Sequence, residues 1–254
     1  MTKTVLVLHA HPHPRSLTRH LATAASAELA AAGHRVLESD LYGMGWKAVF
    51  DGDDFRDRQD TERLSFISES GHAFTTGTQT ADVQAEQEKL IAADAIVMQF
   101  PLWWFTAPAI VKGWIDRVFA FGFAYGYKGA GNRYRYGEGG LAGKRALLSV
   151  TVGGPEVDYG PRGINGPLEQ LLFHITHGTL FFAGFDVMPT YAVYDAVGLE
   201  DASAATRGLA TRLAGLFTDT PIPFRRQNDG DYPDRHTLGL HVATSLVGID
   251  AHRR

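Results

Sequence analysis

The chain has 254 residues, with 24 lysine and arginine against 28 aspartate and glutamate residues, which gives a formal net charge of −4 at pH 7. A surface that follows nucleic-acid phosphates needs an excess of positive charge, so this balance argues against a nucleic-acid-binding protein. The chain contains no cysteine, which excludes disulfides, thiolate metal sites, iron–sulfur clusters and a cysteine nucleophile. Any redox chemistry must therefore come from a bound cofactor.

With 44% hydrophobic and 20% charged residues, the composition is typical of a folded globular protein. The most apolar stretch, residues 95–111, is shorter than the roughly 20 residues of a membrane span and is interrupted by two prolines. The first residues lead into a short apolar run without the features of a signal peptide. We therefore expect a cytoplasmic protein with no membrane insertion.

The first predicted elements alternate between strand and helix. Residues 4–10 are nearly continuously apolar and β-branched, which is typical of a strand covered on both faces. A helix is predicted over 16–32, between a capping serine and a glycine, and a weaker strand over 34–40. Residues 41–79 show no sustained periodicity and are too long for an ordinary connection, which indicates a functional or partly helical excursion.

The remaining elements continue this alternation. The sequence predicts helices over 80–92, 108–119, 168–182 and 201–217, strands over 95–100, 145–150 and 186–192, and a glycine- and tyrosine-rich loop over 122–143. Five alternations of strand and helix argue for a doubly wound α/β fold with a five-stranded parallel sheet and right-handed crossovers. The ligand of such a fold binds beyond the carboxyl ends of the strands.

We predict two parts of the chain, a catalytic domain over residues 1–217 and a C-terminal extension over 218–254. The extension contains three prolines and one short apolar stretch, residues 238–249. This stretch would form an exposed patch in a monomer, so we expect it to pack on a partner chain in a homodimer.

The loop after the first strand, residues 9–18, contains no glycine, which disfavours a glycine-rich dinucleotide fingerprint. It offers the imidazole of His11, the hydroxyls of Ser16 and Thr18, and amides at a helix N-terminus, a combination that can hold a phosphate. For Ser16 alone, a plain helix cap is an equally good interpretation. Histidines at 9, 11 and 13 suggest a metal, but no carboxylate accompanies them, and we expect no metal site.

Three consecutive aromatic residues, Trp103, Trp104 and Phe105, follow the third strand. They cannot all face one way, so at least one ring should lie against a planar group or at an interface; a local hydrophobic plug is the alternative. After the fourth strand, Gly153 and Gly154 allow a ligand to approach the backbone, although such a pair is often only a turn. Together the loops describe a site for a flat heteroaromatic ring attached to phosphate, which a flavin fits best.

These segments closely resemble the NAD(P)H:quinone oxidoreductases, the flavodoxin-like enzymes also called DT-diaphorases, and their bacterial relatives. The matching segments are residues 38–42, 85–87, 99–119, 123–125, 153–154 and 159–160. The resemblance runs from about residue 4 to 217, and its most specific part is the run from Gln99 to Phe119. It implies a homodimer that binds FAD, with FMN the less expected cofactor, and that transfers hydride from NAD(P)H to quinones by a ping-pong mechanism.

The resemblance also implies roles for individual residues. The loop after the first strand would hold the FAD diphosphate and ribityl chain through His11, Ser16, Leu17 and Thr18. The loop after the third strand would hold the isoalloxazine ring through Leu102, Trp103, Trp104 and Phe105, and the loop after the fourth strand through Thr151, Val152, Gly153 and Gly154. Tyr159 matches the catalytic tyrosine that stabilises the flavin after hydride transfer. Tyr125 and Tyr127 match tyrosines of the quinone pocket, the second supplied across the dimer interface, and Asp116 matches an acidic residue facing the partner's flavin.

The main departure from the family pattern is Asn165, which stands where a histidine usually pairs with the catalytic tyrosine in a proton relay. Asparagine does not titrate near neutral pH, but it can hydrogen-bond a quinone oxygen or the amide of NAD(P)H. We therefore expect Asn165 to contribute to catalysis and substrate binding with a flatter pH dependence. Residues 61–78, where further cofactor contacts belong, do not match the family residue by residue.

Other interpretations stay open. The chain could be an FMN-dependent azo- or nitroreductase, an ancillary regulatory flavoprotein subunit of a potassium-efflux transporter, or a flavodoxin-type electron carrier, although the aromatic loop counts against the last. Arg133, Tyr134, Arg135 and Tyr136 belong to a loop that is either solvated or in contact with substrate. For His174 and His177 we expect hydrogen-bonded or interface positions rather than metal ligation. Trp114 is expected in the core or at an interface.

Overall fold

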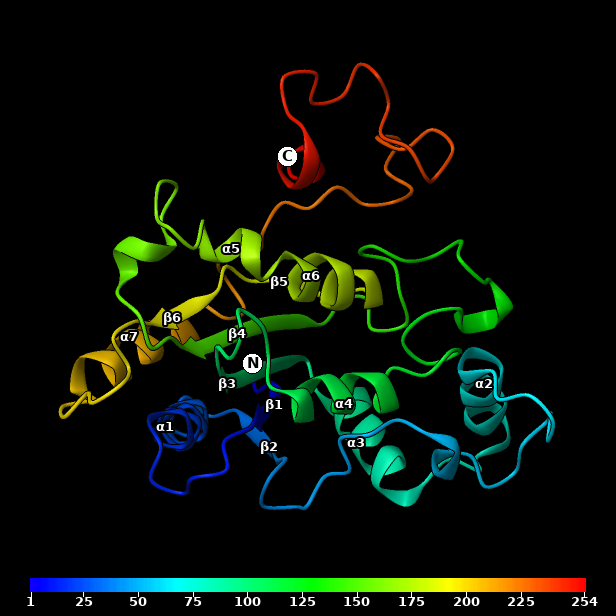
Figure 1. The fold of residues 1–254 in the computed structure, drawn as a ribbon, viewed down its shortest axis with the longest axis horizontal. Helices are drawn as coiled ribbons and strands as arrows, with labels where there is room; N and C mark the ends of the chain where they lie inside the picture. Colours follow the sequence, from blue (N-terminus) through cyan, green and yellow to red (C-terminus); the bar gives the residue numbers. More distant parts are fainter.

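The computed structural model describes the backbone of all 254 residues and every side chain except that of Lys128. Its strands form one parallel sheet in the order β2-β1-β3-β4-β5. The sixth strand, β6, pairs directly with the last three residues of β4, whereas β5 pairs with the first two. The strands are β1 (Thr4–His9), β2 (Arg35–Asp40), β3 (Ala95–Pro101), β4 (Arg145–Thr151), β5 (Asp186–Val187) and β6 (Tyr191–Val193). This topology confirms the predicted doubly wound α/β fold (Figure 1).

Helices cover both faces of the sheet. They are α1 (Leu17–Ala31), α2 (Phe66–Thr76), α3 (Ala81–Ala92), α4 (Ala109–Val118), α5 (Leu168–Leu171), α6 (Phe173–Ile175), a π-helical segment (Thr176–Phe181) and α7 (Ser203–Ala214). Apolar residues of α1 and α7 pack on one face of the sheet, and those of α3, α4 and the α5–α6 region pack on the other. Alternate residues of each strand therefore enter different cores, which explains the continuous apolar runs in the sequence.

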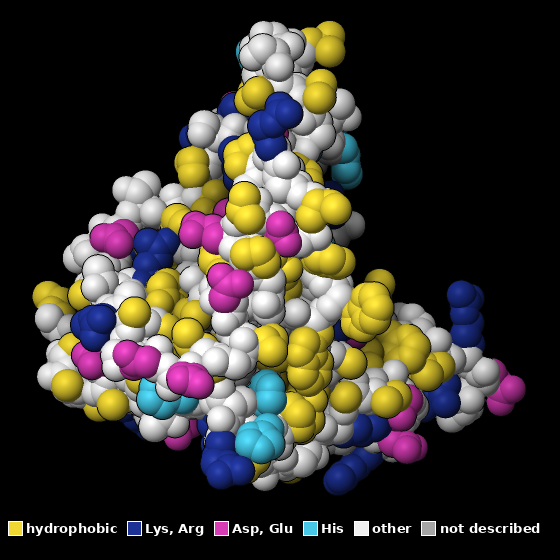
Figure 2. Space-filling view, turned by 60° about the vertical axis from the view of Figure 1, so that its left-hand side comes forward, with side chains coloured by type: hydrophobic (Ala, Val, Ile, Leu, Met, Phe, Trp, Pro, Cys, Tyr) yellow, Lys and Arg dark blue, Asp and Glu magenta, His cyan; other side chains and the backbone are white. Residues whose placement is uncertain are grey.

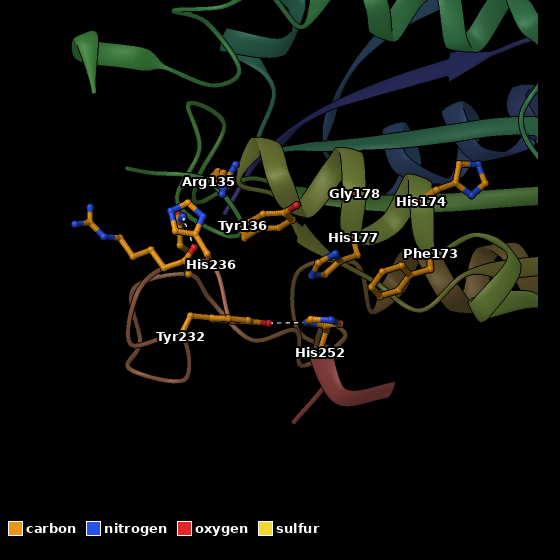
Figure 3. Close-up of a pocket in the computed structure, with 11 residues that line it drawn as sticks. Arg135, Tyr136, Phe173, His174, His177, Gly178, Tyr232, His236 and His252 are labelled. Atoms are coloured by element: carbon orange, nitrogen blue, oxygen red, sulfur yellow. Dashed lines mark hydrogen bonds between the residues drawn. The ribbon is translucent and has the colours of Figure 1, made fainter. Parts of the chain in front are cut away.

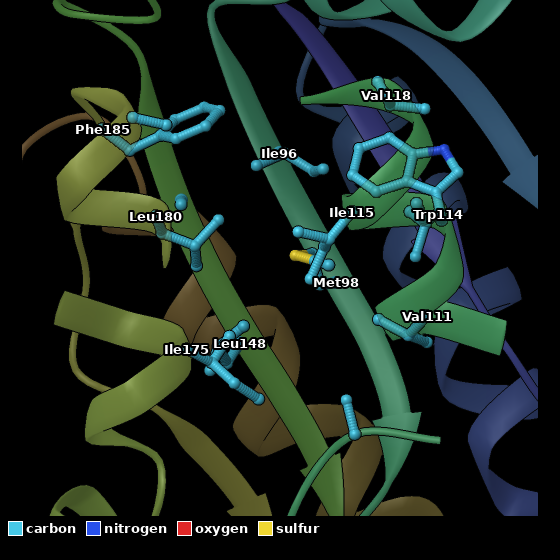
Figure 4. Packing of buried hydrophobic residues seen from close by; sticks show 14 of the residues in the cluster. Ile96, Met98, Val111, Trp114, Ile115, Val118, Leu148, Ile175, Leu180 and Phe185 are labelled. Carbon is cyan, nitrogen blue, oxygen red and sulfur yellow. The ribbon is translucent and has the colours of Figure 1, made fainter. Parts of the chain in front are cut away.

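Trp114 lies in the larger core, fully buried among residues of β3, β4 and α4 (Figure 4). Its indole Nε1 donates a hydrogen bond of 2.8 Å to the carboxylate of Glu86, so its polar atom is satisfied. The neighbouring Gly113 lets α4 approach the segment before η1 (Gly52–Asp54), because a Cβ at this position would lie 1.9 Å from the carbonyl oxygen of Ala48. The helix that carries the most specific run of the sequence is thus held by close contacts on two sides.

The excursion over residues 41–79 is partly helical, as expected, and a buried arginine fastens it to the domain. The guanidinium of Arg117 in α4 contacts the carboxylates of Asp54 at 2.6 Å and Asp82 at 2.7 Å, and it lies 4.3 Å from the ring centre of Trp46. A buried charge is stable only when it is paired in this way. The excursion is therefore part of the folded domain.

Two predicted elements differ from the structure. The single strand predicted over 186–192 is wrong: Pro189, which has no amide proton for a ladder, separates β5 from β6. The helix predicted over 168–182 is interrupted at Leu172 and widens into the π-helical segment. There the hydroxyls of Thr176 and Thr179 donate to the carbonyl oxygens of Leu172 and His174, and such back-bonding competes with the regular helical ladder.

Residues 218–254 are largely irregular apart from a short 3₁₀ helix, η5 (Gly248–His252). They form a lobe that stands beyond α5 and α6, coloured orange to red in Figure 1. Ion pairs of Asp231 with Arg225 at 2.9 Å and with Arg254 at 3.2 Å close the lobe on itself. None of the helices in the described chain is long and apolar enough to cross a bilayer.

Candidate functional site

The loops at the carboxyl ends of β1, β3 and β4 converge on a cavity of about 370 Å³. Eight of the residues singled out from the sequence line this cavity, namely His11, Ser16, Leu17, Thr18, Leu102, Trp103, Thr151 and Gly153. His13, Pro101, Ala196 and Val197 complete its lining. The cavity thus lies where the topology of a doubly wound sheet places a ligand.

Two buried threonines join the first and the fourth loop at this cavity. The hydroxyl oxygens of Thr18 and Thr151 lie 2.9 Å apart, and the two residues are only 2% and 6% exposed. Either hydroxyl can be the donor in this pair. The contact ties the N-terminus of α1 to the end of β4, so the two walls of the cavity are held at a defined separation.

The N-terminus of α1 presents uncharged donors to the cavity. The Ser16 hydroxyl oxygen accepts a hydrogen bond of 3.1 Å from the Arg19 amide, which makes Ser16 the helix cap and leaves its own proton free to donate. The amides of Leu17 and Thr18 belong to the first turn, where helical partners are lacking. The two interpretations of Ser16 are therefore compatible, because a capping serine can still donate to a phosphate.

His11 adds a further neutral donor. Burial lowers the pKa of His11 below its ordinary value of 6.5. Its Nδ1 accepts a hydrogen bond of 3.0 Å from the His13 amide, so the proton of the neutral ring is on Nε2. The ring meets Trp103 edge to face, with centres 6.0 Å apart. His11 can thus donate from Nε2 while it packs against the aromatic loop.

The aromatic loop after β3 is a tight turn in a strained conformation. Trp103 and Thr106 exchange two backbone hydrogen bonds of 3.0 and 3.1 Å, and the residues between them, Trp104 and Phe105, have φ angles of 51° and 61°. The left-handed region is costly for bulky residues. Trp104 is 93% exposed, so its own packing in this chain does not explain the strain. A strained, exposed aromatic turn is typical of a surface that receives a ligand or a partner chain.

The third loop is also connected to the π-helical region. His174 Nδ1 lies 2.9 Å from the carbonyl oxygen of Leu171, which must accept, so the Thr106 hydroxyl donates to His174 Nε2 at 2.7 Å. His174 is therefore hydrogen-bonded through both nitrogens, in agreement with the expectation for this residue.

Tyr159 and Asn165 are brought together by a compact loop after β4. The Asn165 amide donates a hydrogen bond of 2.9 Å to the carbonyl oxygen of Asp158. A Cβ at Gly163 would lie 2.3 Å from that same oxygen, so only glycine permits this closure. The Tyr159 ring packs over Gly154, whose Cβ position is 3.5 Å from the ring and 3.8 Å from its hydroxyl. Tyr159 thus lies beside the glycine pair, and Asn165 is held to Asp158, the residue before Tyr159 in the chain.

The loop after β6 also lines the cavity, and the sequence reasoning missed it. The amides of Asp195 and Ala196 donate to the carbonyl oxygens of Gly154 and Val152 at 3.0 and 2.9 Å, which fastens this loop to the glycine pair. Val197 projects over the Cβ position of Gly153 at 3.3 Å. The signal was available, because every loop that follows a strand of a parallel sheet opens at the same edge.

Three residues assigned by resemblance do not line the cavity within one chain. Tyr125 is half-buried beside Phe182, with ring centres 5.6 Å apart, and the hydroxyl of Tyr127 donates to the Glu138 carbonyl oxygen at 2.9 Å. Asp116, on α4, forms an ion pair with the lysine one turn before it. The lining also lacks six further residues assigned by resemblance, namely Val152, Gly154, Trp104, Phe105, Tyr159 and Asn165.

The donor set of the cavity suits a phosphate joined to a planar ring. No group of three or more histidine, aspartate or glutamate side chains in the described part of the chain is arranged to hold a metal ion. Helix amides, two hydroxyls and an imidazole can bind an anion without a fixed positive charge. Aromatic side chains on one side and glycine backbone on the other can enclose a flat ring. These features together fit a flavin nucleotide.

Comparison with known proteins identifies relatives along almost the whole chain. A family model described as flavodoxin-like fold matches residues 3–215. The chain is 45% identical over 241 residues to the ribosyldihydronicotinamide dehydrogenase-like protein traD of Penicillium crustosum, which covers 93% of this chain and 89% of that protein. It is 35% identical over 226 residues to NAD(P)H dehydrogenase (quinone) 1 of Rattus norvegicus, covering 87% of this chain and 80% of the rat protein.

Among solved structures, a candidate quinone reductase from Klebsiella pneumoniae is 48% identical and has a TM-score of 0.94, with both chains covered completely. The agreement extends over the C-terminal lobe as well as the sheet, because the whole of each chain is matched.

Proposed function

Because the chain belongs to the flavodoxin-like fold family, among the relatives of the NAD(P)H:quinone oxidoreductases, we propose that it is a quinone reductase. It would reduce quinones by two electrons, with NAD(P)H as the donor and a bound flavin as the cofactor. The observation that carries the proposal is the convergence of helix amides, Ser16, Thr18, Trp103 and the Gly153 backbone on one cavity. Aromatic and backbone surfaces of this kind suit a planar redox cofactor rather than a metal or a covalent nucleophile.

We propose FAD as the cofactor, on the basis of the resemblance over residues 99–119 and the phosphate-binding chemistry of the first loop. His11, Ser16 and Thr18 would hold the diphosphate and the ribityl chain, and Trp104 and Phe105 the ring. A bound flavin would supply hydride transfer from NAD(P)H to a quinone, and we propose that donor and acceptor use the same place in turn, in ping-pong order. The protein supplies orientation and electrostatics for both halves of this reaction.

Tyr159 and Asn165 have complementary roles in this proposal. The Tyr159 hydroxyl, which lies next to Gly154, donates a hydrogen bond to negative charge that develops at the pyrimidine edge of the ring. The backbone amides of Gly153 and Gly154 would hold the same edge. Asn165 orients the quinone oxygen or the amide of the donor through its side-chain amide, and it exchanges no proton near neutral pH.

A homodimer completes the site in this proposal. A cavity of about 370 Å³ is near the lower end of the roughly 300–1,000 Å³ of small-molecule sites, so one chain encloses only part of an FAD molecule. Apolar side chains around it are exposed, and hydrophobic side chains gather in a band below the protruding lobe in Figure 2. A second copy would cover this band and supply Tyr127 and Asp116 from its own surface. Residues 238–249, with Leu240 and Val247 exposed, are available for the same interface.

The first experiment is the visible spectrum of the purified protein before and after anaerobic NADPH, followed by release and chromatographic identification of the cofactor. We expect a flavin spectrum that bleaches with NADPH, release of FAD, and parallel double-reciprocal lines when NADPH and a naphthoquinone are varied. Released FMN together with faster turnover of an azo dye would establish the azoreductase alternative. Colourless protein that takes up neither FAD nor FMN would refute the proposal.

The second experiment compares Tyr159→Phe with Tyr194→Phe, a matched control whose ring centre is 5.7 Å from that of Tyr159. Removal of a well-placed donor to developing charge costs about 100-fold in rate. We expect this loss in flavin reduction by NADPH for Tyr159→Phe and little change for the control. Equal rates in the wild type and in Tyr159→Phe would exclude the role of this hydroxyl.

A further inference from the structure

A second cavity, of about 400 Å³, lies between the π-helical segment, the loop before β4 and the C-terminal lobe. Figure 3 shows Tyr136, Phe173 and His177 on one side of it and Tyr232 with His252 on the other. This cavity shares no lining residue with the cavity at the carboxyl ends of the strands. The two cavities are therefore distinct within one chain.

The lining of this cavity is cationic. Two guanidinium groups, those of Arg135 and Arg235, belong to it, and none of its lining residues is an aspartate or a glutamate. The nearest carboxylates of the lobe have partners of their own: Asp231 pairs with two other arginines, and Asp234 accepts hydrogen bonds from the backbone amides of His236 and Thr237. The cavity thus presents positive charge without a counter-ion from its own walls.

Two of the four imidazoles that line the cavity, those of His177 and His252, add ring surface rather than charge. Burial lowers the pKa of His177 to about 4 and also lowers the pKa of His252, so both rings are neutral at pH 7. His177 is stacked between Phe173, at 4.4 Å and 12°, and Tyr136, at 4.9 Å and 27°. The ring planes of Tyr232 and His252 are nearly parallel, at 7°, and a hydrogen bond of 2.8 Å joins the two side chains. The ring centre of His252 lies 5.7 Å from that of His177.

Hydrogen-bonding capacity in the walls is also unused. Gln227 is 2% exposed, and its Nε2 donates to the Arg235 carbonyl oxygen at 3.1 Å. Its Oε1 and the Nε of Arg135 have no hydrogen-bond partner among the described residues. Buried polar atoms are rarely left unpaired in native proteins, so a group from outside the chain is expected near these side chains.

From these observations we propose that the cavity binds a planar aromatic carboxylate of the hydroxybenzoate kind. Its ring would lie against Tyr136 and Tyr232, beside the contact between His177 and His252, where offset or edge contacts with aromatic rings are favourable. Its carboxylate would pair with Arg135 and Arg235, because guanidinium groups match carboxylates through two parallel hydrogen bonds. Its hydroxyl supplies the donor that the Gln227 oxygen lacks. A neutral quinone would leave both guanidinium groups without a counter-ion.

The test is isothermal titration of the full chain, as purified with its cofactor, with 4-hydroxybenzoate. We expect saturable binding that Arg235→Gln weakens by about tenfold or more, since a hydrogen bond to a charged group contributes about 1.5–3 kcal/mol. Gly178→Leu should abolish binding, because Gly178 lines the cavity and a Cβ at this position meets no atom within 4 Å. The leucine side chain can therefore be accommodated by the chain and would occupy the space of the ligand. Arg207→Gln, which changes an exposed arginine on α7, is the matched control and should bind like the wild type.

Three comparisons can overturn the proposal. If cyclohexanecarboxylate binds as tightly as 4-hydroxybenzoate, contacts with an aromatic ring play no part. If AMP binds more tightly than 4-hydroxybenzoate, the ligand is an aromatic phosphate and not a carboxylate. Displacement of 4-hydroxybenzoate by a naphthoquinone acceptor would place it in the catalytic site instead. The titration measures binding and not turnover. Absence of 4-hydroxybenzoate binding would therefore refute this proposal and leave the flavin proposal intact, and a protein without flavin that still binds 4-hydroxybenzoate would do the opposite. Thermal unfolding of each variant verifies that it is folded.

Discussion

The Thr18–Thr151 contact makes a sharp test of how the cofactor cavity is held together. Thr18→Val keeps the shape of the side chain but removes its hydroxyl, so the hydroxyl of Thr151, 2.9 Å away in the native chain, loses its partner. An unpaired buried polar group costs about 1–3 kcal/mol. For a chain of this size the melting temperature of the apoprotein should therefore fall by about 2–12 °C.

The double variant separates this explanation from simple loss of packing. Replacing both partners by apolar groups of the same shape leaves no unpaired hydroxyl, so Thr18→Val with Thr151→Val should be less destabilised than the sum of the single variants. We expect a coupling energy of about 1 kcal/mol or more from urea unfolding of the apoproteins. Strictly additive losses would mean that water in the cavity satisfies each hydroxyl, and would refute the idea that this pair holds the two loops.

Three further predictions concern other parts of the chain. Gly113→Ala should lose about 3 kcal/mol or more in urea unfolding, because the added Cβ lies 1.9 Å from the Ala48 carbonyl oxygen; loss near zero would contradict that contact. The pKa of His177 is about 4 in the folded chain, against 6.5 in the unfolded chain. Its contribution of about 3 kcal/mol to the free energy of unfolding is therefore present above pH 6.5 and lost as the pH falls from 6.5 to 4. His177→Phe should make the free energy of unfolding less dependent on pH across this window. Asn165→His should add a titration near pH 6.5, about the ordinary pKa of histidine, to the pH profile of kcat/KM, and an unchanged profile would place Asn165 outside the reaction.

Most of the fold was predictable because its signals are local. The apolar run over 4–10 and the serine-to-glycine helix over 16–32 need only their own residues to be recognised. The order of the strands then follows from the alternation of strand and helix and from the handedness of crossovers. Loops that end on the same edge of the sheet could accordingly be assigned to one cavity before any coordinates were known.

The parts that could not be predicted depend on contacts between distant segments. β6 has only three residues and exists through its pairing with β4, so its loop, with Ala196 and Val197, gave no strand signal of its own. The left-handed turn at Trp104 and Phe105 contradicts local preference, since bulky residues avoid that region. Conflicts of this kind between local preference and the fold are concentrated at functional sites, which agrees with the place of this turn beside the cavity.

The two cavities differ in the charge of the side chains that line them. Among the side chains that the structure describes, no lysine or arginine lines the first cavity, whereas two arginines line the second one. In a site without fixed cations, the proposed hydride transfer would depend on oriented dipoles to stabilise charge that develops on the ring. The helix amides, the Gly153–Gly154 backbone and the Tyr159 hydroxyl are the groups proposed for this role. Few groups then share this task, so removal of the Tyr159 hydroxyl should affect rate far more than cofactor affinity. The second cavity has the opposite design, because fixed guanidinium charges select a ligand that is already an anion before it binds.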